Sequence, residues 1–464
     1  MAANLEDYAL IGDCETAALV GRDGSIDWLC WPRFDSDACF AALLGSRDNG
    51  RWLLAAFDGK AHVSRRYRDR TLILETEIET ADGAATLVEF MPPRGKNSDV
   101  VRLARGRRGS VAFHTELIVR FDYGSLVPWV TNPEGGAWRA ISGPDMIVLR
   151  TPVQLRGKDL TTVGDFTVAA GETVPFVLTH GPSYMGLPGS LDVAEALRET
   201  ETFWCDWAGR ARSSSPWSQA TLRSLITLKA LTHFPTGGIV ASPTTSLPER
   251  LGGKRNWDYR FCWLRDATFT LIALMNAGYY EDARAWREWL LRAVAGAPDR
   301  VQIMYAVTGE HRLPKWEVPW LDGYQGAKPV RVGNAAAEQV QIDVYGEVMD
   351  AIHHGRHGKL GPSADGWQLQ RGLLDHLEKI WEEPDHGIWE VRGDRQRFTN
   401  SKVVAWVAFD RAVKTVEQFK MEGWSDGASC AAPSMTTSAA SASIPRSAPS
   451  YRAMAPNIST PARY

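Results

Sequence analysis

The chain has 464 residues and a formal net charge of -3, from 52 basic and 55 acidic residues. This length predicts two domains, and the balanced charge without a basic patch argues against nucleic acid or an anionic membrane as a partner. A neutral small substrate fits better, and the 19 tryptophans supply either core volume or flat platforms for sugar rings.

The cysteines and the N-terminal residues bear on location. The six cysteines form no CxxC pair and no disulfide-scaffold spacing. The opening residues, MAANLEDYAL, lack the charged and apolar regions of a signal peptide, and no apolar run approaches the length of a membrane span. We therefore expect a reduced, cytoplasmic protein.

The first two hundred residues have the pattern of β-structure. Residues 72–90, LILETEIETADGAATLVEF, predict two strands joined by a turn at Ala81-Asp82-Gly83. Residues 110–121 and 173–180 predict further strands, with no helical segment between them. The pattern indicates an antiparallel β-sandwich over residues 1–205.

A helical period begins near residue 215. Residues 219–234 carry apolar side chains at helical spacing, and a linker is expected at 206–218. Five further helices are predicted to start near these positions: Cys262, Tyr280, Ala335, Trp367 and Lys402. About six helices, separated by long loops, therefore form a second domain over residues 219–423.

The last segment, residues 424–464, differs from the rest of the chain. It is dominated by Ala, Ser, Pro and Thr, and it contains no Leu, Val, Phe, Glu or Lys. Such a composition cannot bury enough apolar surface to offset the entropy lost on ordering, so we expect disorder.

Residues 256–271, NWDYRFCWLRDATFTL, concentrate aromatic and charged side chains just before a predicted helix. Asp266 could simply cap that helix. Alternatively, Arg265 and Asp266 bind sugar hydroxyls while Tyr259 and Trp263 wall the pocket.

Two other segments carry candidate polar groups. Residues 333–348 predict a helix with Gln339, Gln341 and Asp343, which are either solvated or turned toward a substrate. In residues 385–393, DHGIWEVRG, Glu390 follows Trp389. It is either an exposed loop acid or a general acid whose pKa the neighbouring ring raises by excluding water.

The sequence gives little indication of metal binding, serine-nucleophile catalysis or nucleotide binding. His353 and His357 have the i, i+4 spacing of metal ligands, but no third ligand is evident, so no metal site is expected. There is no GxSxG motif, Walker A motif or dinucleotide-binding fingerprint.

Four stretches together resemble the glucoamylase-type glycoside hydrolases of family 15, in the bacterial branch with glucoamylase-like and trehalase-like members. They lie at 11–45, 252–283, 329–352 and 382–412, and they include IGDCETAALVGRDGSIDWLCWPRFD, NWDYRFCWLRDATF, GNAAAEQVQIDVYGEV and DHGIWEVRG. The resemblance runs in order to about residue 423. It implies a β-sandwich joined to an (α/α)6 toroid of twelve helices.

The resemblance also implies roles for individual residues. Glu390 matches the family's general acid, with Trp389 beside it. The remaining matches are to residues that bind the sugar: Tyr259, Trp263, Arg265, Asp266, Gln341 and Asp343. No cofactor is implied.

The chain departs from the family pattern at its end. The carboxylate that activates water lies late in the family's chains, beyond the matched stretches, and only about half of the toroid's helices are predicted here. If the codons of residues 424–464 are read in the neighbouring reading frame, permitted codons can encode peptide segments such as SIHDDVC and FVQGYGS. These segments resemble the continuation of the family's sequences. We therefore hypothesise a truncation with a frameshift near residue 423, and an inactive product.

The leading interpretation is an inverting, exo-acting hydrolase that releases glucose from an α-glucan, an oligosaccharide or trehalose. A disaccharide phosphorylase, with phosphate replacing water, is the second interpretation. The third is a sugar-binding remnant without catalysis. The sequence indicates neither the choice of glucoside nor the oligomeric state.

Overall fold

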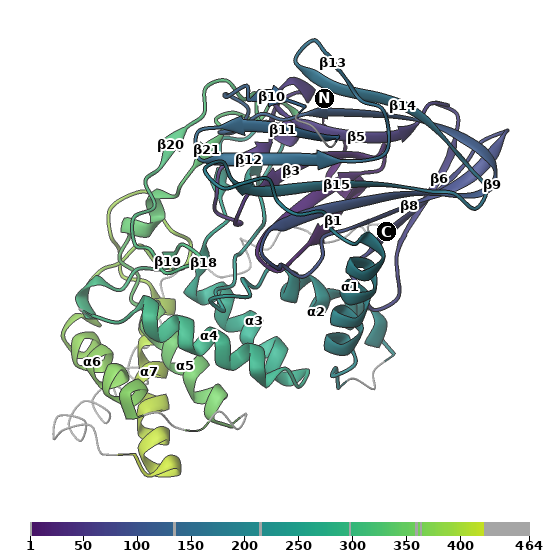
Figure 1. Cartoon of the computed structure of the whole chain (residues 1–464). Helices are drawn as coiled ribbons and strands as arrows, with labels where there is room; N and C mark the ends of the chain where they lie inside the picture. The colour runs from purple at the N-terminus through teal and green to yellow at the C-terminus, as the bar shows by residue number, and fades with distance from the viewer. Residues whose placement is uncertain are drawn as a thin grey trace, which may run out of the picture.

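The computed structural model describes residues 2–132, 136–212, 216–296, 298–357, 361 and 364–421. A broad antiparallel β-sandwich is followed by α-helices that extend away from one end of it (Figure 1). The predicted class, a sandwich joined to a partial α/α domain, is confirmed. The hypothesis about residues 424–464 lies outside the described residues.

Fifteen strands form the sandwich: β1 Tyr8–Gly12, β2 Ala17–Gly21, β3 Ser25–Cys30, β4 Ala38–Phe40, β5 Arg51–Ala56, β6 His62–Tyr67, β7 Leu74–Glu79, β8 Gly83–Phe90, β9 Ser98–Ile118, β10 Trp129–Thr131, β11 Ala137–Ser142, β12 Asp145–Arg150, β13 Arg156–Lys158, β14 Thr161–Ala169 and β15 Thr173–Pro182. Six short strands follow: β16 Thr245–Pro248, β17 Asn256–Asp258, β18 Cys262–Trp263, β19 Met304–Tyr305, β20 Trp316–Glu317 and β21 Arg331–Val332. The hairpin predicted within 72–90 is present as β7 and β8.

The long strand β9 belongs to both layers of the sandwich. Its first half pairs with β8 and β15, and its second half pairs with β5 and β14. Gly106 lies where β9 passes between layers, and a Cβ there would lie 2.0 Å from the Ala169 carbonyl oxygen. The strand can therefore cross between layers only with glycine at this position.

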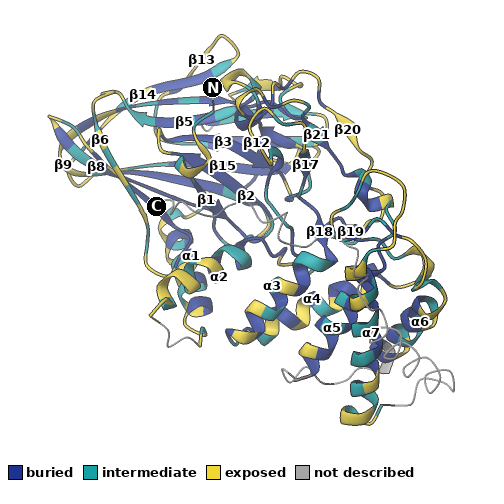
Figure 2. Cartoon of the chain, turned by 180° about the vertical axis from the view of Figure 1, so that it is seen from behind, coloured by how far each residue is buried: buried dark blue, intermediate teal, exposed yellow. Residues whose placement is uncertain are grey.

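Between the layers, apolar side chains enclose one buried ion pair. Arg102 binds Glu89 at 2.6 Å and donates hydrogen bonds to the carbonyl oxygens of Trp52 and Gly24. The pair thus ties β9 to β8, β5 and the turn before β3. Buried residues follow β3, β12 and β15 through the middle of the sandwich (Figure 2).

The described residues contain seven α-helices: α1 Val193–Ala208, α2 Ser218–Ala230, α3 Leu264–Asn276, α4 Tyr280–Ala293, α5 Asp343–His357, α6 Ala364–Ile380 and α7 Thr399–Phe419. The last six correspond to the six that the sequence predicts. Helix α1 was not predicted, and the boundary proposed at residue 205 falls inside it. Its Ala196 and Leu197 cover the outer face of β8, β9 and β15.

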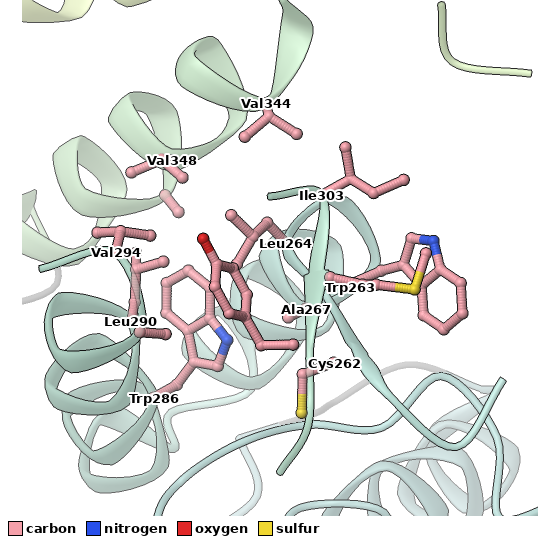
Figure 3. Close-up of a cluster of buried hydrophobic side chains, with 14 of the residues drawn as sticks. Cys262, Trp263, Leu264, Ala267, Trp286, Leu290, Val294, Ile303, Val344 and Val348 are labelled. Atoms are coloured by element: carbon pink, nitrogen blue, oxygen red, sulfur yellow. The ribbon is translucent and has the colours of Figure 1, made fainter. Parts of the chain in front are cut away.

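The helices enclose a second core. Leu264 and Ala267 of α3, Trp286 and Leu290 of α4, and Val344 of α5 converge in it (Figure 3). Helix α3 ends at Asn276, and Gly278, two residues later, has a φ of 99° in the left-handed region that glycine favours.

Helix α5 is central, because it contacts α3, α4, α6 and α7. A Cβ at Gly346 would lie 2.0 Å from the Val404 carbonyl oxygen, so this glycine allows α5 and α7 to pack backbone against backbone. None of the described helices is both long and apolar enough to cross a bilayer.

Arg260 joins the sandwich to the helical region. Its guanidinium is fully buried and binds both carboxylate oxygens of Asp258, at 2.9 and 2.7 Å. It also donates to Ser36 O at 2.7 Å and to the Tyr123 hydroxyl at 2.8 Å, both in the sandwich domain. Asp258 in turn accepts a hydrogen bond from Gly333 N. This junction fixes the segment that leads into α3.

Replacing Arg260 with methionine should therefore destabilise the protein strongly. The change leaves the Asp258 carboxylate buried without its counterion, which costs about 3–5 kcal/mol of unfolding free energy. Chemical denaturation measures it. Arg198→Met, which removes an exposed pair with Glu195, is the control and should leave the unfolding free energy almost unchanged. Equal effects of the two changes would contradict the assigned role.

Candidate active site

The start of α3 and the loop after α6 bring the predicted acid and the sugar-binding residues together. Trp263 Nε1–H donates a 2.8 Å hydrogen bond to Glu390 Oε1. Arg265 lies on the same side, with Nη2 3.7 Å from Glu390 Oε1 and Nη1 donating to Ile388 O at 3.2 Å. Tyr259 packs on Trp263, with ring centroids 5.6 Å apart.

The backbone at Glu390 is unusual. Its φ of 51° lies in the left-handed region, which is costly for a residue with a Cβ, and which recurs at functional sites. Glu390 N donates to Gly387 O at 3.0 Å, while the Gln339 side chain donates to the carbonyl oxygens of Glu390 and Val391. These contacts hold the turn that presents the carboxyl group to Trp263.

The expectation that Trp389 shields Glu390 from water is wrong. The Trp389 side chain is 84% exposed, because the turn directs it into solvent. The indole that contacts the carboxyl group belongs to Trp263, which is 2% exposed. A sugar-stacking role for Trp389 stays a prediction, since an exposed ring is free to act as a platform.

Asp266 does not cap α3. The helix begins at Leu264, its N-cap is Trp263, and Asp266 lies in the first turn. Asp266 Oδ2 is 3.2 Å from Arg265 Nη2 but accepts no hydrogen bond of normal geometry. Its side chain remains 44% exposed, so the carboxylate is accessible at the front of the site.

The predicted helix carrying Gln339, Gln341 and Asp343 is only partly present. A short 3-10 turn spans Ala335–Glu338, and α5 begins at Asp343, so both glutamines precede the helix. Ile342 N donates to Asp385 Oδ2 at 2.9 Å, which fixes this extended entry to the loop that carries Glu390.

Behind the accessible residues lies a layer of buried carboxyl groups. Asp343 is fully buried and accepts a 3.2 Å hydrogen bond from Asn400 of α7. Burial and the nearby Asp385 raise the pKa of Asp343 to about 6. Burial and Asp343 raise the pKa of Glu347, one turn further along α5, to about 8.

Arg265 carries the positive charge at the centre of this group. Burial opposes its charge, but four carboxyl groups outweigh that effect and raise its pKa: Asp266, Glu347, Glu390 and Asp343. Burial and the nearby carboxylates Glu249, Glu390 and Asp266 likewise raise the pKa of Tyr259 to about 12, so its hydroxyl stays protonated as a hydrogen-bond donor. We call Tyr259, Trp263, Arg265, Asp266, Gln341, Asp343, Glu347, Asp385 and Glu390 the Arg265 cluster.

Many polar atoms of the Arg265 cluster have no hydrogen-bond partner. They include Asp266 Oδ2, Gln341 Nε2, Asp343 Oδ1, Glu347 Oε2 and Asp385 Oδ1. Buried polar groups normally find partners, and unpaired ones cost stability. Their concentration in one place is typical of a site that completes its hydrogen bonds with a polar ligand.

Sequence reasoning missed Glu347 and Asp385. The four-residue spacing of Asp343 and Glu347 in DVYGEV puts both on one face of a helix, and this signal was available. Asp385 offered none, because its role depends on the loop folding back onto residues 340–342.

Both histidines of the i, i+4 pair, His353 and His357, lie in α5. His353 is buried, with Nδ1 3.5 Å from Thr415 Oγ1, and the side chain of His357 lies outside the described residues. Among the residues described there is no group of three or more side chains able to hold a metal ion.

Comparison with known proteins places the chain in a family. The model for glycosyl hydrolases family 15 matches residues 216–461, and a trehalase-like N-terminal model matches residues 1–172. The chain belongs to glycosyl hydrolases family 15, as the resemblance predicts. The match reaches into residues 424–464, and the frameshift hypothesis for that segment stays a prediction.

Individual relatives agree with this assignment. The chain is 34% identical to a trehalase of Mycolicibacterium smegmatis, over 89% of this chain and 66% of the relative. It is 33% identical to trehalase 1 of Sulfolobus acidocaldarius, over 90% of this chain and 74% of the relative. The chain thus spans about two thirds of the length of the mycobacterial relative.

A solved structure supports the fold. A bacterial glucoamylase in complex with acarbose superposes with a TM-score of 0.66 at 13% identity. The superposition covers 94% of this chain and 66% of the glucoamylase.

The buried carboxyl group of Glu347 predicts a pH dependence of stability. A carboxyl group whose pKa rises on folding stabilises the fold below its unfolded pKa, and that contribution is lost as pH rises through the folded pKa. The loss therefore falls between pH 4.5 and about 8. Glu347→Gln removes the titration, so its stability relative to the parent should increase across this window, by about 3–5 kcal/mol in total.

Thermal unfolding at several pH values measures this difference. Glu338→Gln changes an exposed acid at the end of the 3-10 turn before α5; it is the matched control and should show no such increase. A constant difference between Glu347→Gln and the parent would mean that Glu347 is already ionised at neutral pH.

Proposed function

We propose that this protein hydrolyses trehalose, with Glu390 as the general acid. The observation that carries the proposal is the Glu390 carboxyl group, held by Trp263 beside the Arg265–Asp266 pair and in front of buried polar atoms without partners. The trehalase names of the relatives support the choice of glucoside.

The sugar-binding step uses the accessible part of the Arg265 cluster. Asp266 accepts hydrogen bonds from ring hydroxyls, and Arg265 donates to their oxygens, as charged groups do with particular strength. The half-buried Tyr259 supplies an aromatic wall for the ring, while Trp263, buried behind Tyr259, holds Glu390 instead of contacting the sugar. The glucose unit with the reacting C1 then lies within reach of Glu390.

In the chemical step, Glu390 donates its proton to the glycosidic oxygen as the bond from C1 to that oxygen breaks. A water molecule attacks C1 from the opposite face, and its proton passes to a second carboxylate. Inverting enzymes hold that carboxylate about 6.5–9.5 Å from the acid. In the family that carboxylate lies late in the chain, beyond the stretches matched here, and residues 424–464 of this sequence contain one acidic residue, Asp426. The products are one β-glucose and one α-glucose.

Glu390→Gln tests the assigned acid, because it preserves size and hydrogen bonding but removes the proton. We expect turnover of trehalose to fall about 10²–10⁴-fold, with trehalose affinity changed less than about threefold. Glu338→Gln is the control and should match the parent. Proton NMR measures the anomers released from trehalose, maltotriose and isomaltose, each with and without phosphate.

Each alternative gives a distinct result in this assay. Strict dependence on phosphate with a sugar phosphate as product would make the protein a phosphorylase. Preference for maltotriose or isomaltose would identify a glucan substrate and refute trehalose. Sugar binding without turnover by the parent would favour a non-catalytic protein, while full activity of Glu390→Gln would remove Glu390 from the mechanism.

A further inference from the structure

The β-sandwich contains a cavity of about 430 Å³ that lies apart from the Arg265 cluster. It is lined by strands β11, β12 and β14 and by the chain around β10 and β13, which lie at the top of Figure 1, away from α3–α7. We call it the sandwich cavity. Its volume is in the range of small-molecule sites.

The inner wall of the sandwich cavity is apolar. Leu117 comes from the end of β9, Val119 from the residue just after it, and Ile147 and Leu149 from β12; all four are buried core side chains. The mouth is apolar as well, since Trp129 is 68% exposed and Leu160 is 71% exposed. Exposed apolar side chains gathered around a hollow typically mark a binding site.

One buried cation also lines the sandwich cavity. Arg120 is 8% exposed, and its guanidinium donates to Val119 O at 2.8 Å and to Leu160 O at 3.3 Å. Within the part of the chain that the structure describes, Arg120 has no carboxylate within ion-pairing distance. Arginine stays charged under such conditions, so its burial is offset by carbonyl dipoles and by the more distant charge of Asp48.

The other charged side chains that line the sandwich cavity are mostly positive, like Arg120. Arg139 and Lys158 line it together with Arg120, and Asp159 is the one acidic side chain among the lining residues. An anion entering the cavity would therefore find a positive potential and a desolvated guanidinium. Both features favour a charged head group over a neutral one.

We propose that the sandwich cavity binds a small amphiphilic anion, with a carboxylate or phosphate on Arg120 and a short acyl chain or aromatic ring against Leu117, Ile147 and Leu149. The polar hydroxyls of a sugar would face an apolar wall there, so carbohydrate is disfavoured. This binding is separate from the proposed hydrolysis, because no lining residue comes from the helical region.

The test compares matched probes on the whole chain by calorimetry and thermal shift. Octanoate should bind at least tenfold more tightly than octanol, and inorganic phosphate alone should bind weakly. Arg120→Met should abolish the preference for octanoate. Arg22→Met, an exposed arginine paired with Asp7, should leave it unchanged.

A second variant keeps the test decisive if Arg120→Met fails to fold. Leu160→Glu adds a negative charge at the exposed mouth and should weaken octanoate binding severalfold more than octanol binding. Equal affinity for octanoate and octanol, or no binding of either, would overturn the proposal. So would trehalose binding that is lost in Leu160→Glu but kept in Glu390→Gln.

Discussion

The architecture depends on one buried guanidinium, that of Arg260. It binds Asp258 within its own segment and reaches Ser36 and Tyr123 of the sandwich domain. Burying a charge is costly unless every partner is in place, so the pair tolerates only one arrangement of the two domains. The chain runs from this anchor directly through Cys262 into Trp263, Arg265 and Asp266. The sandwich therefore helps to position the residues that contact Glu390.

The Arg265 cluster also depends on close packing between α5 and α7. Gly346 lets the two helices approach, which brings Asn400 to Asp343 and holds the buried carboxyl groups behind Arg265. These groups cost stability in the absence of a ligand, since several of their atoms lack partners. Proteins commonly accept this cost where a preorganised site must bind a polar molecule.

Several features could be predicted from the sequence alone. Alternating strands, the turn at Asp82-Gly83 and the helical period after residue 215 are local signals, and the structure follows them. The family resemblance placed Trp263, Arg265, Asp266 and Glu390 in one site, and they do meet. Helix α1 also carried a readable signal, because Ala196, Leu197, Trp204 and Trp207 are spaced as one helical face.

Other features depend on contacts that no local pattern contains. Trp389 is exposed in the turn where Glu390 takes a left-handed conformation, and this turn is held by contacts with Gly387 and Gln339. In the sequence, Arg260 has the pattern of a surface charge. Its burial depends on Ser36 and Tyr123, which are distant in sequence and contact it only in the fold. Arg120 presents the same difficulty, since its burial depends on the turn at Leu160.

We infer that the unpartnered polar atoms of the Arg265 cluster complete their hydrogen bonds when a sugar binds. A crystal structure of the chain with 1-deoxynojirimycin, a glucose-shaped imino sugar, tests it most directly. We expect the ring on Tyr259, with hydroxyls hydrogen-bonded to Arg265 and Asp266 and with Glu390 facing the position of C1. An imino sugar bound elsewhere, with the Arg265 cluster unchanged, would contradict the account.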